Sequence, residues 1–399
     1  MNAGRQAPGV VLLTEEVWGS ALHAMRELDR GGVATSVVTF GRGAAILGRS
    51  RHCHAALDLP PGADPIPAAL DWAQHRHPGA APVAVVPLSD RLADLLDRRR
   101  DELPPRFRPA LPEPGVLAPL LDKPCSLRLA AAAGLHVPRW ATVRTRDDLA
   151  AVKGLELPVA VRPTGWRTAG RRPHKISVHH DTAILIEALR GQLDAGAELL
   201  VQEYLQEPED AVEFALVWRA RDRTSTVVCT GRKRRQSGPA GGVMAWGQTA
   251  ALPDVADAAQ RFLDHAGYVG LGGIELIRTS AGLRFIEFNP RLEAIHFLGS
   301  RAGVDTLRLE VAELTGFAAP ALRDPPVTAT AWVGSAWLAR LRSDPGSWRL
   351  LLRDRLRFAR SPRRIRAVWS WTDPLPALAL VWRLLSRWLD QKRSDRVTR

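Results

Sequence analysis

Apolar and polar residues alternate in two neighbouring runs in the last third of the chain, Gly273–Thr279 and Leu283–Asn289. The runs are separated by Ser280-Ala281-Gly282. Alternation with a period of two is typical of half-buried strands, and a three-residue connection with glycine at a left-handed position is typical of a β-hairpin. The pattern therefore predicts a hairpin whose loop closes on Thr279 and Leu283.

This hairpin brings two acidic residues together. In the expected register Glu275 lies directly opposite Glu287, while Asn289 shares the strand face of Glu287 and Phe288 lies on the other face. Opposed carboxylates repel each other, so their placement favours a bound cation. With Arg291 just beyond the strand, the three oxygen-bearing side chains suit Mg²⁺ ions that bridge nucleotide phosphates. An exposed polar sheet face is the alternative.

The first hundred residues follow a strand–helix–strand order. The expected strands and helices are Val10–Leu13, Ser20–Arg30, Val33–Phe40, Val83–Val86 and Arg91–Arg100. This order predicts a parallel sheet and an α/β fold class. No G-x-G-x-x-G follows the first strand, so a dinucleotide-binding fingerprint is absent. Ser89 and Asp90 follow a strand end, where ligands bind, although helix capping is the better explanation for them.

The middle of the chain begins with a proline-rich linker, 104–119, which holds six prolines. A helix is expected over Ser126–Ala133, and a strand over 157–163 ends in a cation, Arg162. A basic, glycine-containing loop then runs from Thr164 to Lys175. Anion binding needs backbone access and converging charge, so the loop between these two cations is a candidate phosphate site.

Two further segments complete the candidate site. A buried strand, 199–205, runs into a polar bend, 206–210, and then into a strand over 212–218; a plain β-hairpin is the alternative reading. Downstream, 231–242 is a second basic, glycine-rich segment that includes Arg232 and Lys233. A solvated charge run is the default explanation for such a segment.

Composition and charge narrow the class of protein. The chain has 399 residues, of which 46% are apolar and 24% charged, as in a folded globular protein. Its three widely spaced cysteines form no disulfide or metal motif, which predicts a cytoplasmic location. The adjacent His52, Cys53 and His54 cannot easily converge on one ion. The N-terminus lacks a signal peptide pattern, and no apolar stretch is long enough for a membrane span.

The net charge of +13 belongs mostly to the C-terminal tail. From Arg340 onward there are sixteen Arg and Lys against five Asp and Glu, and 332–399 holds seven of the thirteen tryptophans. Basic amphipathic helices are expected over 350–358 and 378–389. Such a tail fits a helical lid on the protein body, peripheral contact with the inner face of the membrane, or, less readily, nucleic acid.

In their order along the chain, these segments resemble the ATP-grasp superfamily. The segments are D-K-x₁₀-G-L-H-V-P-R-W from Asp122, the two basic loops, the strand before the polar bend, and G-I-E with F-I-E-F-N-P-R around Glu275 and Glu287. Ser50-Arg51-His52-Cys53 also resembles the preface domain of ATP-grasp carboxylate–amine ligases, including D-aspartate-ligase-like proteins. The resemblance implies a preface α/β domain over 1–115, an ATP-grasp domain over 116–320 and a basic helical extension over 321–399.

The resemblance also implies roles for individual residues. Metal ligands would be Glu275, Glu287 and Asn289; phosphate-binding cations would be Arg162, where the family has lysine, and Lys175; and Arg291 would stabilise the transferring group. Nucleotide contacts would come from Gln202, Glu203, Tyr204, Leu205, Asp210, Glu213, Arg232 and Lys233. The implied cofactors are ATP and Mg²⁺ or Mn²⁺.

The implied reaction joins a small-molecule carboxylate to an amine through an acyl-phosphate, with ADP and phosphate as products. A carboxylase or a small-molecule kinase of the same fold is one alternative, although Ile295 stands where carboxylases carry a general-base glutamate. A non-catalytic nucleotide- or nucleic-acid-binding protein is another. The fold is compatible with a homodimer.

Overall fold

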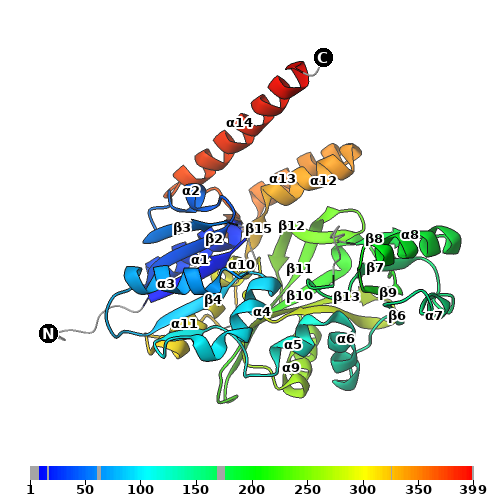
Figure 1. The fold of residues 1–399 in the computed structure, drawn as a ribbon, viewed down its shortest axis with the longest axis horizontal. Coiled ribbons are helices and arrows are strands. Elements are labelled where there is room, and N and C mark those ends of the chain that lie inside the picture. The colour runs from blue at the N-terminus through cyan, green and yellow to red at the C-terminus, as the bar shows by residue number, and fades with distance from the viewer. Residues whose placement is uncertain (1–8, 16–17, 61–63, 169–175, 325, 398–399) are drawn as a thin grey trace. The chain divides into compact units, whose positions relative to one another are not determined.

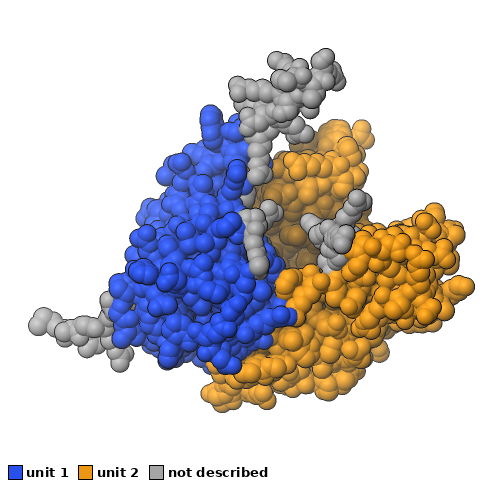
Figure 2. All heavy atoms as spheres, in the orientation of Figure 1, with its two compact units in different colours: residues 1–110, 311–320, 366–399 blue, residues 111–310, 321–365 orange. Residues whose placement is uncertain are grey.

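The computed structural model describes residues 9–15, 18–60, 64–168, 176–324 and 326–397, with side chains in the last helix described as far as Ser386. Figure 1 shows helices and strands mixed along the whole chain, as the α/β class predicts. Contacts divide the chain into two compact units, coloured separately in Figure 2. Unit 1 comprises 1–110, 311–320 and 366–399, and unit 2 comprises 111–310 and 321–365.

Unit 1 is built on a parallel five-stranded sheet with the order β3-β2-β1-β4-β5. Its strands are β1 (Gly9–Thr14), β2 (Ala34–Phe40), β3 (Ala55–Leu59), β4 (Val83–Pro87) and β5 (Phe107–Pro109). Its central strands are buried on both faces, which explains their continuous runs of valine and leucine. The predicted strand–helix–strand unit is confirmed.

Five helical segments of unit 1 connect these strands. They are α1 (Trp18–Arg30), α2 (Ala44–Leu47), α3 (Ile66–Arg76), α4 (Asp90–Arg98) and the short 3₁₀ helix η1 (Arg100–Glu102). Ser89 caps α4, since its side chain accepts a hydrogen bond from the backbone N–H of Leu92 at 3.3 Å. The capping explanation for Ser89 is therefore confirmed.

Unit 2 contains a four-stranded antiparallel sheet with the order β6-β9-β7-β8. Its strands are β6 (Trp140–Val143), β7 (Val159–Pro163), β8 (Ser177–His179) and β9 (Leu199–Glu203), and it packs on α7 (Leu149–Val152) and α8 (Thr182–Asp194). The strand after β9 belongs to the other sheet of this unit. The plain-hairpin reading of 199–218 is therefore wrong.

The second sheet of unit 2 has seven strands in the order β14-β13-β10-β11-β12-β15-β16. These strands are β10 (Val212–Arg219), β11 (Thr226–Gly238), β12 (Gly241–Thr249), β13 (Gly270–Thr279), β14 (Gly282–Asn289), β15 (Thr330–Trp332) and β16 (Arg364–Arg366). Apolar residues of α5 (Leu117–Leu121), α6 (Lys123–Ala132) and α9 (Pro253–Ala266) share a core with one face of β10, β13 and β14. The opposite face carries Glu275 together with apolar side chains such as Phe214 and Leu216.

The β13–β14 hairpin differs from its prediction at the turn. Thr279 pairs with Gly282, so the loop has two residues instead of three. A β-bulge at Ile286 then shifts the register by one, and Glu275 lies opposite Glu287 as predicted. The bulge also lets Phe285 and Phe288, three residues apart, both enter the core behind the sheet. The expectation that Glu287 and Phe288 lie on opposite faces is confirmed.

The C-terminal extension does not form a compact unit of its own. Its helices are α12 (Gly334–Ser343), α13 (Trp348–Arg360) and α14 (Leu375–Val397), with the 3₁₀ helix η3 (Pro345–Ser347) between the first two. The helices α10 (His296–Ala302) and α11 (Thr306–Thr315) come before the extension. Both α12 and α13 pack on strands of the seven-stranded sheet. Residues 366–399 belong to unit 1. Among the described residues, no helix is long and apolar enough to span a membrane.

Candidate active site

A cavity of about 420 Å³ in unit 2 collects most of the predicted site residues. It is lined by side chains of both sheets of that unit. The predicted residues that line it are Arg162, Gln202, Glu203, Tyr204, Leu205, Lys233, Glu275, Glu287, Asn289 and Arg291. Segments that are far apart in the sequence therefore meet at one place, as a single binding site requires.

The two opposed carboxylates each meet a cation of the chain itself. Lys233 Nζ lies 2.6 Å from both carboxylate oxygens of Glu275. Arg162 donates to Glu287 Oε2, to the side-chain oxygen of Gln202 and to the backbone oxygen of Ile286, each at 3.0 Å. The sequence predicts a cation at this place, and the structure supplies two protein cations there.

Burial and charge act in opposite directions on these groups. Burial raises the pKa of Glu275 to about 7, although the ammonium of Lys233 opposes the shift. Burial also acts to raise the pKa of Glu287, but the nearby charges of Arg162, Lys123, Lys233 and Arg291 outweigh it and lower the pKa. Burial acts to lower the pKa of Lys233, and the carboxylate of Glu275 reverses this and raises it. The 2.6 Å contacts between Lys233 and Glu275 are those of an ionised pair.

Asn289 lies between two charged residues of the cavity wall. Its amide nitrogen donates to Glu293 Oε1 at 2.5 Å, and its amide oxygen accepts from Arg291 at 3.4 Å. Glu293 also accepts from the backbone N–H of Ala294 at 2.7 Å. The segment 290–295 is irregular, since α10 begins only at His296.

The donor set suits a hard divalent cation, because Glu275, Glu287 and Asn289 offer only oxygen atoms. Glu287 Oε1 accepts no hydrogen bond from any described residue. Both oxygens of Glu275, in contrast, contact Lys233, and no cluster of three or more His, Cys, Asp or Glu side chains suited to a metal ion occurs in the described part of the chain. The residues therefore fit Mg²⁺ by their chemistry, provided that Lys233 releases Glu275.

The strand β9 ends in a short segment with an available backbone donor. The N–H groups of Glu203 and Tyr204 donate to the carbonyls of Arg139 and Pro158, each at 2.9 Å. The N–H of Leu205 donates to no described residue. A donor of this kind at a cavity wall can read the edge of a heterocyclic base.

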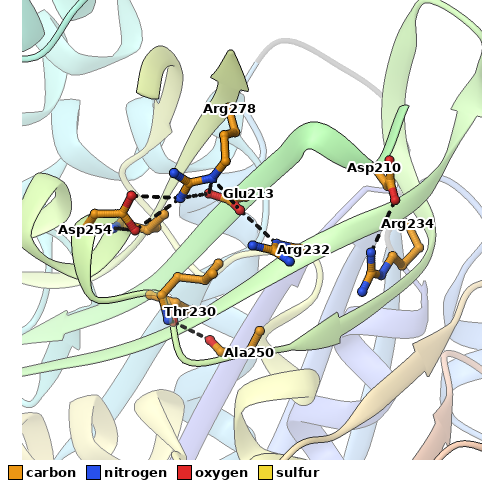
Figure 3. A network of polar contacts seen from close by, with 10 residues as sticks. Asp210, Glu213, Thr230, Arg232, Arg234, Ala250, Asp254 and Arg278 are labelled. Carbon is orange, nitrogen blue, oxygen red and sulfur yellow. Dashed lines mark hydrogen bonds and ion pairs between the residues drawn. The ribbon is translucent and has the colours of Figure 1, made fainter. Parts of the chain in front are cut away.

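Three predicted nucleotide contacts lie outside the cavity lining. Figure 3 shows Glu213 between Arg232 and Arg278, at 2.8 and 2.6 Å, with Arg278 also bound to Asp254 at 2.8 Å. Asp210 pairs with Arg234 at 3.2 Å. Neighbouring residues of a strand point to opposite faces, so Lys233 faces the cavity while Arg232 faces away from it. Lys175 lies outside the described residues.

Sequence reasoning missed five polar residues of the cavity wall, Lys123, Glu207, Glu209, Gln236 and Glu293. Lys123 stands in the quoted Asp122-Lys123 segment, which was its only signal. Glu209 accepts from the backbone N–H of Gln236 at 2.7 Å and from Arg340 of α12 at 3.0 Å. The helix α12 of the tail packs on β11 and β12 and contacts the cavity wall through Arg340.

The Ser50–Cys53 segment of unit 1 has structural contacts. Ser50 Oγ and the backbone N–H of Arg51 donate to Asp373, at 2.7 and 3.2 Å. Cys53 Sγ contacts the carbonyl of Ala55 at 3.3 Å, and burial raises its thiol pKa to about 11. The segment joins two distant parts of unit 1.

Known proteins resemble this chain in structure only. A scan of family models and a search of curated proteins both find no match. Among solved structures, an ADP complex of N5-carboxyaminoimidazole ribonucleotide synthetase has a TM-score of 0.59 at 13% identity, with 80% of each chain covered. The same synthetase from Thermus thermophilus has a TM-score of 0.60 at 16% identity, with 80% of this chain and 82% of that chain covered.

A biotin carboxylase–nucleotide complex from Campylobacter jejuni has a TM-score of 0.62 at 15% identity, with 80% of this chain and 74% of that chain covered. Identities of this size carry the fold and not the activity. A match over 80% of the chain is longer than unit 2, so the likeness includes part of unit 1. This chain has the ATP-grasp fold, the architecture of those structures.

Proposed function

We propose that the protein is an ATP-dependent carboxylate–amine ligase that forms an amide through an acyl-phosphate, with ADP and phosphate as products. The observation that carries the proposal is the meeting of Glu275, Glu287 and Asn289 with Arg162 and Lys233 in one cavity of an ATP-grasp fold. Oxygen ligands and fixed cations around one space suit phosphoryl transfer, which depends on positioning and charge stabilisation.

At the nucleotide end, the N–H of Leu205 would read the adenine edge beside Tyr204. At the metal end, Glu275, Glu287 and Asn289 would hold Mg²⁺, which would neutralise phosphate charge and orient the transferred group. Arg162 and Lys233 would then turn from these carboxylates to the phosphates. Their present partners keep them aimed at that place before substrates bind.

At the reacting end, Arg291 would stabilise the charge that develops on the transferring phosphoryl group. Its guanidinium lies at the cavity wall beside Asn289. Lys175, which the resemblance assigns to the phosphates, is part of the proposal as a second phosphate cation. Arg162 replaces a lysine of the family, but its planar fork can also bind phosphate oxygens in pairs.

The test is ADP and phosphate release from ATP and Mg²⁺ against a panel of carboxylates and amines. We expect release to require one member of each class and to fall by at least about a hundredfold in Glu287→Gln, which loses a metal ligand. Glu187→Gln is the matched control, since that glutamate is 82% exposed on α8. Release without any amine, or full activity in Glu287→Gln, would contradict the proposal.

A carboxylase is the second candidate, because the similar solved structures include biotin carboxylases. Ile295 argues against it, since this buried side chain lines the cavity where the resemblance would require a glutamate. ADP release that depends on bicarbonate, and not on an amine, would favour the carboxylase. A stable phosphorylated product that forms without bicarbonate and without an amine would favour a kinase.

The cellular setting belongs to the same proposal. Three free cysteines suit a reducing cytoplasm. One similar solved structure is described as a domain dimer, which agrees with a homodimer for this chain. The basic tail supports peripheral contact with an anionic membrane surface.

A further inference from the structure

The first three turns of α14 expose a broad apolar surface, which we call the α14 face. It consists of Leu375, Leu378, Val381, Trp382, Leu384 and Leu385. Trp382 is 73% exposed and the others are between 44% and 54% exposed. Leu375, Leu378, Trp382 and Leu385 recur at helical spacing, so they follow one side of the helix. Trp371, just before the helix, is 81% exposed and extends the apolar surface.

The base of α14 is held firmly in unit 1 by Asp373. This aspartate is 2% exposed and accepts from Arg26 at 3.0 Å and from Ser50 at 2.7 Å. Ala377, in the first turn, is buried, and Arg383 donates to the carbonyl of Arg42. The helix that carries the α14 face is therefore fixed to unit 1 at its first turns, while the side chains of the α14 face remain exposed to solvent.

Three other aromatic residues of the extension are placed differently. Trp332 and Trp337 are buried and stack at 5.2 Å between ring centroids, and Phe358 of α13 packs on Trp332. Asp354, fully buried in α13, pairs with Arg235 of β11 at 2.7 Å. Trp337 of α12 and Phe358 of α13 are thus buried in unit 2, whereas Trp382 of α14 is exposed.

Charge indicates what the α14 face binds. Residues 366–399 hold seven Arg and Lys against three Asp. Arg42, Arg49 and Arg51, around α2, are exposed, and α2 contacts α14. An apolar helix face bordered by cations fits the interface of an anionic bilayer, where leucine and tryptophan enter the headgroup region and arginine stays with the phosphates.

We propose that the α14 face binds the surface of an anionic lipid bilayer and lies along it without crossing it. A second copy of the chain fits less well, because a symmetric contact would bring two basic helices together. Single-stranded nucleic acid also fits less well, since aromatic rings stack on bases but the α14 face is mostly leucine and valine. The proposal concerns location and does not depend on the ligase reaction.

The experiment is flotation of the full-length protein with vesicles of phosphatidylcholine, with and without phosphatidylglycerol. We expect binding only to the anionic vesicles, weakened by salt, because charge attraction and apolar insertion act together. The double variant Trp382→Ser, Leu385→Ser should bind at least about tenfold more weakly, since two interfacial side chains are lost. ATP-dependent activity without vesicles should not change, because neither residue lines the cavity.

The matched control is Trp348→Ser, Leu352→Ser in α13, where the two side chains are 51% and 56% exposed. We expect this variant to bind vesicles as the wild type does. Equal loss in both variants, or no binding of the wild type to anionic vesicles, would overturn the proposal. Two further results would overturn it if the vesicle binding of the α14 variant stays unchanged. One is a change from dimer to monomer, measured by light scattering, in the α14 variant alone. The other is a loss of RNA binding in the α14 variant alone.

Discussion

At the scale of single residues, two ion pairs define the candidate site. One joins two strands of the same sheet of unit 2, and the other joins the two sheets of that unit. Lys233 reaches Glu275 along the same sheet, and Arg162 reaches Glu287 from the other sheet. Opposed carboxylates without a counter-charge would repel each other in this buried place. The chain therefore carries its own counter-charges, and a metal ion has to compete with Lys233 for Glu275.

We predict that Lys233→Met lowers the free energy of unfolding by about 3–5 kcal/mol, because it leaves Glu275 buried beside Glu287 without its cation. Mg²⁺ should raise the melting temperature of this variant more than that of the wild type, since a divalent ion can replace the lost ammonium. The measurement is thermal unfolding with and without Mg²⁺.

Lys153→Met is the control for this prediction, as Lys153 is exposed and outside the cavity. It should leave both the stability and the Mg²⁺ response unchanged. An identical Mg²⁺ response in Lys233→Met and the wild type would show that Glu275 is not a metal ligand.

At the scale of elements, the bulge at Ile286 decides which side chains face the cavity. It lets Phe285 and Phe288 enter the core while Glu287 faces the cavity, and it turns the carbonyl of Ile286 toward Arg162. The two-residue turn and the bulge cancel in the register. A three-residue turn without a bulge would therefore place Glu275 opposite Glu287 as well, so the predicted pairing is right although the predicted turn is not.

We predict that deletion of Ile286 leaves a folded protein, because regular pairing then still places Phe285 and Phe288 in the core and Glu287 at the cavity. The deletion removes the carbonyl that Arg162 binds and the local bend of the strand. ATP and Mg²⁺ should then bind more weakly and raise the melting temperature by less than about half as much as in the wild type. The reason is that a bound ligand stabilises the folded state by RT ln(1 + [L]/Kd).

Ile286→Ala keeps the bulge and its carbonyl, so it should retain the response to ATP and Mg²⁺. The prediction fails if the deletion variant responds as strongly as the wild type, since the bulge would then not position the site. It also fails if the deletion variant does not fold while Ile286→Ala does.

At the scale of the whole molecule, a buried histidine makes the stability of unit 1 depend on pH. Unit 1 holds His77, which is buried and shares a hydrogen bond with Ser36 at 2.9 Å. Burial, with smaller effects from the charges of His54 and Arg106, lowers the pKa of His77 to about 4. An unfolded histidine titrates near pH 6.5, so the folded state holds His77 neutral where the unfolded chain would take up a proton.

We predict that this contribution to stability is complete above about pH 6.5 and is lost as the pH falls from there to about 4. After discounting for solvent screening, the loss is about 2 kcal/mol. The measurement is urea unfolding between these pH values for the wild type and His77→Gln. The variant should lose less stability over this range, and equal losses in the two proteins would contradict the prediction.

The sequence by itself determined the parallel sheet of unit 1, the order of the ATP-grasp segments and the opposition of Glu275 to Glu287. These features depend on local periodicity, on turn residues and on a motif whose members stand close together in the chain. The same local signals placed Ser89 at a helix cap and Phe288 in the core.

Only the tertiary structure decided which cations contact those carboxylates and which basic residues point away from the cavity. Arg232 and Lys233 are neighbours with the same charge, and the strand sends one to Glu213 and the other to Glu275. It also divided the basic tail, because Trp337 of α12 and Phe358 of α13 are buried in unit 2 while Trp382 of α14 stays exposed. The physical reason is that a charge or an apolar face is satisfied by whatever packs against it, and a local pattern does not specify that partner.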